Sequence, residues 1–160
     1  MRILFLCMGN ICRSPAAHCV FQKLVNGSEW ADQFVVDSAG TTHFHAGSSP
    51  DARIQQQLMI RGIPVLGRAK QIDRFDLEYY DLILAMDKDN LAYLEAMDTQ
   101  NIYGEKFKLF CEYCRHHQDQ EVPDPYYGGH QGFDYVMELI VDGCQSLFDQ
   151  ACDQLQLDAK

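Results

Sequence analysis

The chain has 160 residues, of which 47% are hydrophobic, and it carries a formal net charge of −10 at pH 7. This length suits one domain, residues 1–160, and the acidic balance argues against a nucleic-acid partner, because phosphate backbones attract basic surfaces. No run approaches the roughly 20 apolar residues that span a bilayer. The N-terminal apolar run is too short for a secretory signal. Seven cysteines, an odd number, suit a reducing compartment better than a disulfide framework. We therefore expect a cytoplasmic protein without membrane insertion.

Strand-like and helix-like segments alternate along the chain. Short apolar runs predict strands at 3–6, 33–37, 82–84 and 106–109. Helices are predicted at 16–25, 51–61, 90–97 and 133–154, and Gly62-Ile63-Pro64 ends the second of them. The last helix has an apolar face made of Val136, Leu139, Ile140, Gly143, Leu147 and Ala151. The polar stretch 110–124 is typical of a long surface loop. This alternation predicts an α/β fold, a three-layer sandwich with a central four-stranded parallel sheet and helices on both faces.

A reactive loop lies between the first predicted strand and the first predicted helix. It reads Cys7-Met8-Gly9-Asn10-Ile11-Cys12-Arg13-Ser14-Pro15. Backbone N–H groups converge at a helix N-terminus, so a loop in this place is an anion site. Arg13 offers a planar pair of donors for phosphate oxygens. Thiols at helix N-termini beside cations ionise readily, and we expect Cys7 to be a nucleophilic thiolate.

Other residues of this loop have predicted supporting roles. Gly9 and Asn10 tolerate the left-handed backbone conformations that turn N–H groups inward. Ser14 is a candidate N-cap of the helix and lies within local reach of the Cys7 thiolate as a hydrogen-bond donor. The loop therefore predicts nucleophilic attack on a bound oxyanion.

Asp124 is the candidate general acid. Pro123 and Pro125 restrict the backbone on either side of it, although Asp before Pro is also an ordinary turn signal. One carboxyl group can protonate a leaving group and then accept a proton from water. The aromatic residues Tyr126 and Tyr127 follow at once and are candidate walls of a slot for a flat ring.

The segment 7–15 resembles the phosphate-binding loop of the low-molecular-weight protein tyrosine phosphatases. Asp37–Thr41, Ser49–Asp51, Asp81–Asp87 and Asp124–Gly128 resemble further family segments in the expected order, over nearly the whole chain. The resemblance implies hydrolysis of phosphotyrosine without a metal or cofactor. Cys7 would form a cysteinyl-phosphate, Arg13 would clamp the phosphoryl oxygens, and Asp124 would act as general acid and base.

The resemblance also implies roles for residues outside the reacting trio. Phe44 falls in the family's variable loop and is expected to form the wall opposite Tyr126 and Tyr127. Ser38 is expected to brace the phosphate-binding loop, and Cys12 to protect Cys7 through a reversible disulfide. A family histidine often joins the bracing network near residue 67, where this chain has Gly67-Arg68-Ala69, so the network departs from the pattern here.

Three alternatives share this fold or loop. Arsenate reductase needs further cysteines after the strand near Ala85, and the stretch 86–89 has none. Protein arginine phosphatases carry threonine where Ile11 stands. A non-catalytic phosphate-binding module would not need the intact Cys7, Arg13 and Asp124.

The remaining expectations concern partners and a second cysteine group. We expect a phosphotyrosine-containing protein as substrate, with tyrosine kinases among the candidates, inhibition by phosphate-like oxyanions, and a monomer or weak dimer. The stretch Cys111-x2-Cys114 with His116 and His117 has metal-ligand character, but no second cluster matches it and adjacent histidines rarely serve one tetrahedral site. We therefore expect no metal there, and a reactive pair of thiols is the slightly favoured interpretation.

Overall fold

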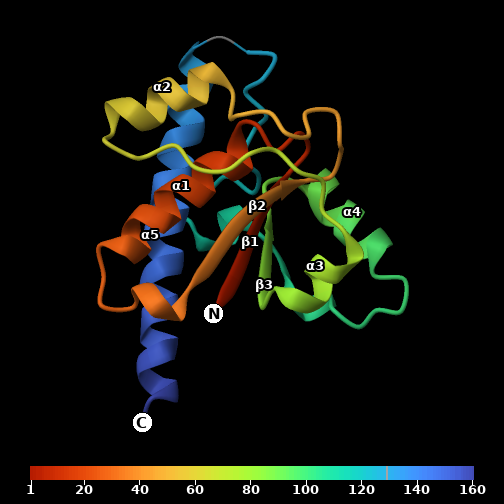
Figure 1. Ribbon diagram of the computed structural model, residues 1–160, viewed down its shortest axis with the longest axis vertical. Helices are drawn as coiled ribbons and strands as arrows, with labels where there is room; N and C mark the ends of the chain where they lie inside the picture. The colour runs from red at the N-terminus through yellow and green to blue at the C-terminus, as the bar shows by residue number, and fades with distance from the viewer. Residues whose placement is uncertain (129) are drawn as a thin grey trace.

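The computed structural model describes residues 1–128 and 130–160, and within them four parallel strands form one sheet (Figure 1). The strands are β1 (Arg2–Cys7), β2 (Val35–Gly40), β3 (Leu82–Ala85) and β4 (Phe107–Leu109). Their order is β2-β1-β3-β4, so that β1 is central and Ile3 pairs with both Val36 and Leu82. Parallel strands end at the same edge of the sheet, and Cys7 therefore lies at the edge where ligands of such folds bind.

Helices cover both faces of the sheet (Figure 1). One layer holds α1 (Arg13–Asn26), α2 (Ala52–Ile60) and α5 (His130–Asp158), and the other holds α3 (Arg74–Tyr79) and α4 (Lys88–Met97). Successive side chains of β1 point to opposite faces. Phe5 accordingly packs with the core under α1 and α5, whereas Leu4 and Leu6 pack with the core under α3 and α4. The predicted three-layer α/β sandwich is confirmed.

The element boundaries differ from the predicted ones in ways that have local causes. β2 begins at Val35 because Ala31–Gln33 form a 3₁₀ turn. The sequence pattern missed α3, a helix of only six residues that starts with a capping box between Asp73 and Asp76. α1 begins at Arg13, so Ser14 lies inside its first turn and the prediction that it caps the helix is wrong.

The stretch 110–124 is more buried than the predicted surface loop. It opens with the 3₁₀ turn η3 (Phe110–Tyr113), and both Phe110 and Val122 are completely buried. The Phe110 ring lies over Gly143 of α5, where a Cβ atom would come within 2.5 Å of the ring. The apolar face predicted for the last helix is buried, and its glycine makes room for this aromatic side chain.

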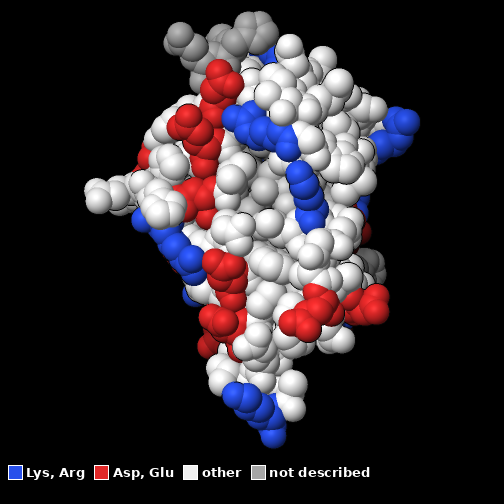
Figure 2. Space-filling view, turned by 90° about the vertical axis from the view of Figure 1, so that its left-hand side faces the viewer, with Lys and Arg blue, Asp and Glu red and all other residues white. Residues whose placement is uncertain are grey.

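Acidic side chains gather along one side of the face formed by the α1, α2 and α5 layer (Figure 2). They reflect the sequence of α5, which has several aspartates but no lysine or arginine. Among the described residues, no helix combines the length and the apolar character that a membrane crossing requires.

Candidate active site

The loop between β1 and α1 forms the floor of a cavity of about 40 Å³. A volume of this order holds a few water molecules, and it therefore suits a group the size of phosphate. Its lining includes Cys7 and Arg13 from the two ends of the loop, with Asp124 from the far end of the chain. The other lining residues are Met8, Gly9, Ile11, Cys12, His45, Tyr126 and Tyr127. The fold thus brings the three candidate reacting residues to one cavity.

Cys7 is surrounded by hydrogen-bonding groups of its own loop. The backbone N–H of Asn10 donates to the Cys7 sulfur at 3.3 Å, and the Ser14 hydroxyl lies 3.0 Å from the same atom. Ser14 is held in this place by the Asn10 side chain, which donates to its oxygen at 2.8 Å. Both groups can donate to a negatively charged sulfur, which is the form a nucleophile needs.

Arg13 is the largest of the fully buried side chains, with 2% of its surface exposed. Its Nη1 group donates to Asp87 at 2.6 Å and to the carbonyl of Val122 at 2.9 Å, and Nη2 lies 3.5 Å from Asp124. Burial lowers the pKa of Arg13, but the negative charges of Cys7, Asp87 and Asp124 together raise it by more than burial lowers it. The pKa of Arg13 therefore lies above its ordinary value. Both Nη1 hydrogens are thus committed to the protein and one Nη2 hydrogen points to Asp124, so that Nε and the second Nη2 hydrogen have no partner among the described residues.

Asp87 is a functional residue that sequence reasoning did not single out. One of its carboxylate oxygens caps α4 by accepting the N–H of Asn90 at 2.8 Å, and the other accepts from Arg13. An Asp followed three residues later by Asn was a readable sign of a helix start. The contact with Arg13 was not readable, because 74 residues separate the two positions.

Asp124 lies at the rim of the cavity with about a third of its side chain, 32%, exposed. Its Oδ1 accepts the N–H of Tyr126 at 3.0 Å, which fixes the carboxylate in a local turn. The backbone just before it is anchored on the floor of the site, since Val122 donates to the carbonyl of Met86 at 2.8 Å and accepts from Arg13. The carboxylate therefore has a defined place above the loop.

Aromatic rings form the outer wall of the cavity. Tyr126 and Tyr127 line it, as predicted, with ring centroids 5.0 Å apart at nearly right angles. The side chain of Phe44 does not line it among the described residues: it is 76% exposed, and its ring lies 5.3 Å from that of His43. His45 stands in the expected place instead, 6.0 Å from the Tyr126 ring, and contact of Phe44 with a bound substrate stays a prediction.

The position of His45 also explains why residue 9 is a glycine. The φ angle of Gly9 is not positive, so the prediction of a left-handed conformation holds for Asn10 (φ 54°) and is wrong for Gly9. A Cβ atom at Gly9 would lie 3.1 Å from the His45 ring, so this glycine provides space beneath the imidazole.

Arg53, at the start of α2, ties the aromatic wall to the rest of the protein. It forms a two-pronged ion pair with Asp51, at 3.0 and 2.9 Å, and donates to the carbonyl of Tyr126 at 3.2 Å. Its guanidinium also lies over the rings of Tyr126 and Phe133, at 5.5 and 4.5 Å. Sequence reasoning missed this residue, although Asp51 before it was a visible helix cap.

The expected bracing network is centred on Asn10. Its amide donates to Ser14 and, at 2.9 Å, to Ser38, while its oxygen accepts the N–H of Lys70 at 2.9 Å. Gly40 makes this arrangement possible, because a Cβ atom there would lie only 2.7 Å from the carbonyl of Met8. Ser38 contacts the loop through Asn10, in line with its predicted position.

His18 of α1 fills the space next to Gly67. A Cβ atom on Gly67 would lie 3.7 Å from the His18 ring, so a histidine is present near this position but comes from another element. Its Nδ1 is buried without a hydrogen-bond partner among the described residues and lies 3.9 Å from Asp37. Burial lowers the pKa of His18, and the neighbouring Asp37 opposes that shift while Lys70 adds to it.

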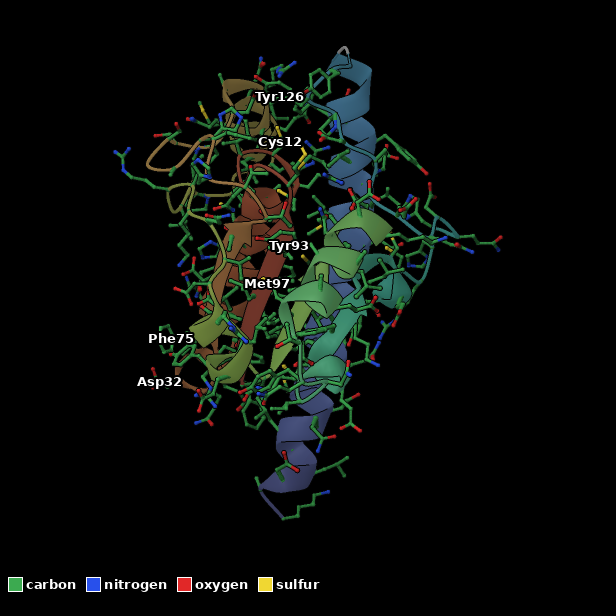
Figure 3. All side chains as sticks on the ribbon, turned by 90° about the vertical axis from the view of Figure 1, so that its right-hand side faces the viewer. Cys12, Asp32, Phe75, Tyr93, Met97 and Tyr126 are labelled. Carbon is green, nitrogen blue, oxygen red and sulfur yellow. The ribbon has the colours of Figure 1, made fainter. Side chains whose placement is uncertain are left out.

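Cys12 lies in the same loop as Cys7, and Figure 3 shows it with Tyr126 at one end of the molecule, away from Asp32 and Phe75. All seven cysteines fall within the described residues and are free thiols. Burial raises the pKa of the Cys12 thiol well above its ordinary range, and the negative charges of Asp51 and Cys7 add to this effect. Cys12 is therefore a protonated neighbour of the candidate nucleophile.

Comparison with known proteins gives consistent matches over nearly the whole chain. Residues 2–159 match the family described as low molecular weight phosphotyrosine protein phosphatase. A Synechocystis protein provisionally named a low molecular weight protein-tyrosine-phosphatase is 46% identical over 147 residues, 92% of this chain and 94% of its own.

Solved structures give the same result. The crystal structure of a protein tyrosine phosphatase from Entamoeba histolytica superposes with a TM-score of 0.90 at 35% identity, covering 96% of this chain and 98% of that one. A Drosophila protein named an arginine phosphatase superposes with a TM-score of 0.85 at 31% identity, covering 94% and 98% of the two chains.

Proposed function

This chain belongs to the low molecular weight phosphotyrosine protein phosphatase family and hydrolyses phosphotyrosine, and on that premise we propose that the reaction proceeds through a cysteinyl-phosphate on Cys7. The supporting observation is that Cys7, Arg13 and Asp124 line one cavity of phosphate size. Residues 7–13 form its floor, where converging N–H groups and the N-terminus of α1 favour a phosphoryl dianion. The Nε hydrogen and the second Nη2 hydrogen of Arg13 donate to its oxygens.

The first step transfers the phosphoryl group to the enzyme. The Cys7 thiolate attacks phosphorus while the bond to the tyrosyl oxygen breaks, and Asp124 gives its proton to that oxygen. Arg13 follows the equatorial oxygens into the transition state, where positioning and charge stabilisation supply most of the rate. The position of Asp124 above the loop, 3.5 Å from the Arg13 guanidinium, supports this role.

The second step releases phosphate. Asp124, now ionised, accepts a proton from a water molecule that attacks the cysteinyl-phosphate, and the Cys7 thiolate leaves. The Ser14 hydroxyl and the Asn10 N–H lie within hydrogen-bond distance of the sulfur, and both stabilise the departing thiolate.

Variants at Cys7 and Asp124 separate these roles. Cys7→Ser is expected to abolish hydrolysis of p-nitrophenyl phosphate, and unchanged turnover would rule out the proposed mechanism.

Asp124→Ala is expected to slow the hydrolysis of phenyl phosphate by about 10²–10⁴-fold. It should slow esters with very good leaving groups far less, since these need no proton. Equal losses across a series of aryl phosphates would exclude Asp124 as the general acid.

Substrate class follows from the walls of the cavity. Tyr126 and Tyr127 flank the approach to Cys7 and favour a flat phenyl ring over the shorter phosphoserine. The Drosophila neighbour raises the alternative of phosphoarginine, but Ile11 places an apolar side chain in the cavity of this chain. Steady-state kinetics on one peptide carrying phosphotyrosine or phosphoarginine tests this. A higher kcat/KM for phosphoarginine would overturn the assignment.

The protein substrate and the regulation of the site are further proposals. A phosphotyrosine-containing protein, with tyrosine kinases among the candidates, is the expected substrate, and the enzyme is expected to act in the cytoplasm as a monomer or weak dimer. Capture by the Cys7→Ser variant, with inorganic phosphate as the competitor, identifies the substrate. Cys12 is the proposed disulfide partner of Cys7. Prolonged peroxide treatment should carry an unprotected Cys7 sulfenic acid on to the sulfinic acid, so dithiothreitol should restore activity in the wild type and not in Cys12→Ser.

A further inference from the structure

Cys111 and Cys114 lie in a tight turn that follows β4 and stands apart from the catalytic cavity. The N–H of Cys114 donates to the carbonyl of Cys111 at 3.1 Å, which closes the turn. The ends of a turn closed between residues i and i+3 have Cα atoms less than about 7 Å apart. A disulfide needs a separation of about 4.4–6.8 Å, so the backbone already has the required approach.

The two thiols of this turn are chemically unequal. The neighbouring Cys114 thiol lowers the pKa of Cys111, although burial and the nearby acids Asp119, Glu121 and Asp142 oppose this shift. The neighbouring Cys111 thiol and burial raise the pKa of Cys114. The pair therefore consists of a more acidic thiol and a protonated partner beside it.

Cys111 is largely buried, with 7% of its surface exposed, but it borders a cavity that opens to the surface. This cavity of about 350 Å³ is lined by Cys111 with Leu109, Glu112 and the segment His117–Gln120. Cys114 is half-buried, and its sulfur lies 3.5 Å from the carbonyl of Leu139 in α5. The third thiol of this region, Cys144, points elsewhere, because its S–H faces the carbonyl of Ala17 at 3.6 Å. A thiol that borders a surface cavity and a second thiol at the other end of the same turn suit a redox pair.

The structure argues against the alternative interpretation as a metal site. Among the side chains that the structure describes, no group of three metal-ligating residues comes together. The Nδ1 atom of His117 lies 2.7 Å from Asp142, and the same carboxylate accepts the N–H groups of Arg115 and His116. His117 and Asp142 thus serve to hold the loop on α5.

We propose that Cys111 and Cys114 form a reversible disulfide, a second redox-modification site whose oxidant is a hydroperoxide. The Cys111 thiolate attacks the outer oxygen of the peroxide, the O–O bond breaks, and the alkoxide or hydroxide leaves and takes up a proton. Cys111 is then a sulfenic acid. The Cys114 sulfur attacks the Cys111 sulfur, its proton goes to the departing hydroxide, and water is released. The two sulfurs are each oxidised by one electron overall, and the peroxide is reduced by two.

Oxidation changes the packing of η3 against α5. The disulfide removes the S–H that now faces the carbonyl of Leu139, and it fixes the turn from which the segment 115–124 departs. Its direct effect therefore falls on this contact and not on the sulfur of Cys7.

A tryptic peptide isolates the pair for measurement. Cleavage after Lys108 and Arg115 yields residues 109–115, which contain Cys111 and Cys114 and no other cysteine. The folded Cys7→Ser protein, in which the catalytic loop has lost its own nucleophile, is treated with hydrogen peroxide, alkylated in denaturant, digested and analysed by mass spectrometry. This readout does not depend on phosphatase activity, so a failure of the disulfide proposal and a failure of the proposed mechanism can be told apart.

The expected product is a peptide that lacks two hydrogens and takes no alkyl group, and dithiothreitol should restore double alkylation. In Cys114→Ser, Cys111 should instead accumulate as a sulfenic acid that dimedone traps and that proceeds to the sulfinic acid. The control Cys152→Ser should leave the disulfide unchanged. Two findings would each overturn the proposal: full double alkylation at a peroxide dose that oxidises Cys7 in the wild type, or stoichiometric zinc retained by the purified protein.

Discussion

At the scale of single residues, Asp87 combines a structural contact and a functional one. One oxygen caps α4 and the other holds Arg13 at 2.6 Å. Asp87→Asn keeps the cap, because asparagine is an equally good N-cap, but it weakens the hold on the guanidinium. We expect kcat/KM for aryl phosphates to fall by about 10–100-fold, the cost of a misplaced catalytic group.

Asp73 offers a matched control for this measurement. It caps α3 in the same way, by accepting the N–H of Phe75 at 2.8 Å, and has no contact with the phosphate-binding loop among the residues that the structure describes. Asp73→Asn should leave kcat/KM unchanged. A similar loss of activity in both variants would mean that Asp87 acts through the helix and not through Arg13.

His18 makes stability depend on pH. Because burial lowers its pKa in the folded state, the unfolded chain binds more protons between that lowered value and the ordinary value of about 6.5. Stability from this group is thus fully present above about pH 6.5 and is lost as the pH falls below it, with a slope of at most about 1.4 kcal/mol per pH unit. Urea unfolding at several pH values should show this slope in the wild type and a reduced slope in His18→Gln.

His43 provides the comparison, since it is an exposed histidine of the variable loop. His43→Gln should retain the slope of the wild type. If His18→Gln also retained it, the loss of stability on acidification would have to come from other groups.

How far single residues were predictable depended on whether their role is local. Cys7, Arg13 and Ser14 stand within eight positions of each other, so a loop between a strand and a helix was enough to bring them together. Asp124 needed the family resemblance, because nothing local distinguishes an acid from a turn signal there. The choice between Phe44 and His45 depends on the path of an irregular loop, which no periodic pattern encodes.

At the scale of elements, the edge of β2 fixes the shape of the phosphate-binding loop. Gly40 ends this strand, and a Cβ atom there would lie 2.7 Å from the carbonyl of Met8 and 3.1 Å from the backbone nitrogen of Asn10. Gly40→Ala must therefore displace backbone, at a cost of about 1–3 kcal/mol in the free energy of unfolding. We also expect a clear loss of kcat, because the displaced atoms belong to the anion site.

Gly104 is the corresponding control, because nothing lies within 4 Å of a Cβ atom placed on it. Gly104→Ala should change neither chemical denaturation nor kcat appreciably. Equal behaviour of the two variants would show that the loop adapts to a side chain at position 40.

Elements were predictable in proportion to their length and periodicity. The buried strands and the long α5 carry strong patterns, and their existence was correctly predicted. The six residues of α3 are too few to establish a period, and the signal that remained was its capping box. The start of β2 was misplaced because the 3₁₀ turn before it follows no apolar alternation.

At the scale of the whole molecule, binding of an oxyanion should stabilise the fold. Inorganic phosphate or sulfate in the catalytic loop binds only the folded state, and at about 100 times the dissociation constant it adds about 2.7 kcal/mol to the free energy of unfolding. Thermal unfolding should therefore shift upward with phosphate, measured against sodium chloride of equal ionic strength.

The shift should disappear in Arg13→Ala and persist in Arg115→Gln, which changes an exposed arginine paired with Asp149. Persistence of the full shift in Arg13→Ala would place the anion elsewhere on the protein. The overall architecture was predictable from the alternation of strands and helices. The closing of the site by residues 122–124 was not, because it depends on contacts across the sheet.

The hydrogen bonds of Arg13 have a consequence for the protein during its synthesis. Its partners Asp87, Val122 and Asp124 follow it by 74, 109 and 111 residues. A ribosome therefore delivers the proposed nucleophile well before the proposed acid, and a nascent chain that ends before residue 87 carries Cys7 with neither a fixed guanidinium nor a proton donor. On the proposed mechanism, we expect phosphatase activity to begin only after residues 122–124 have been made and have folded against Arg13.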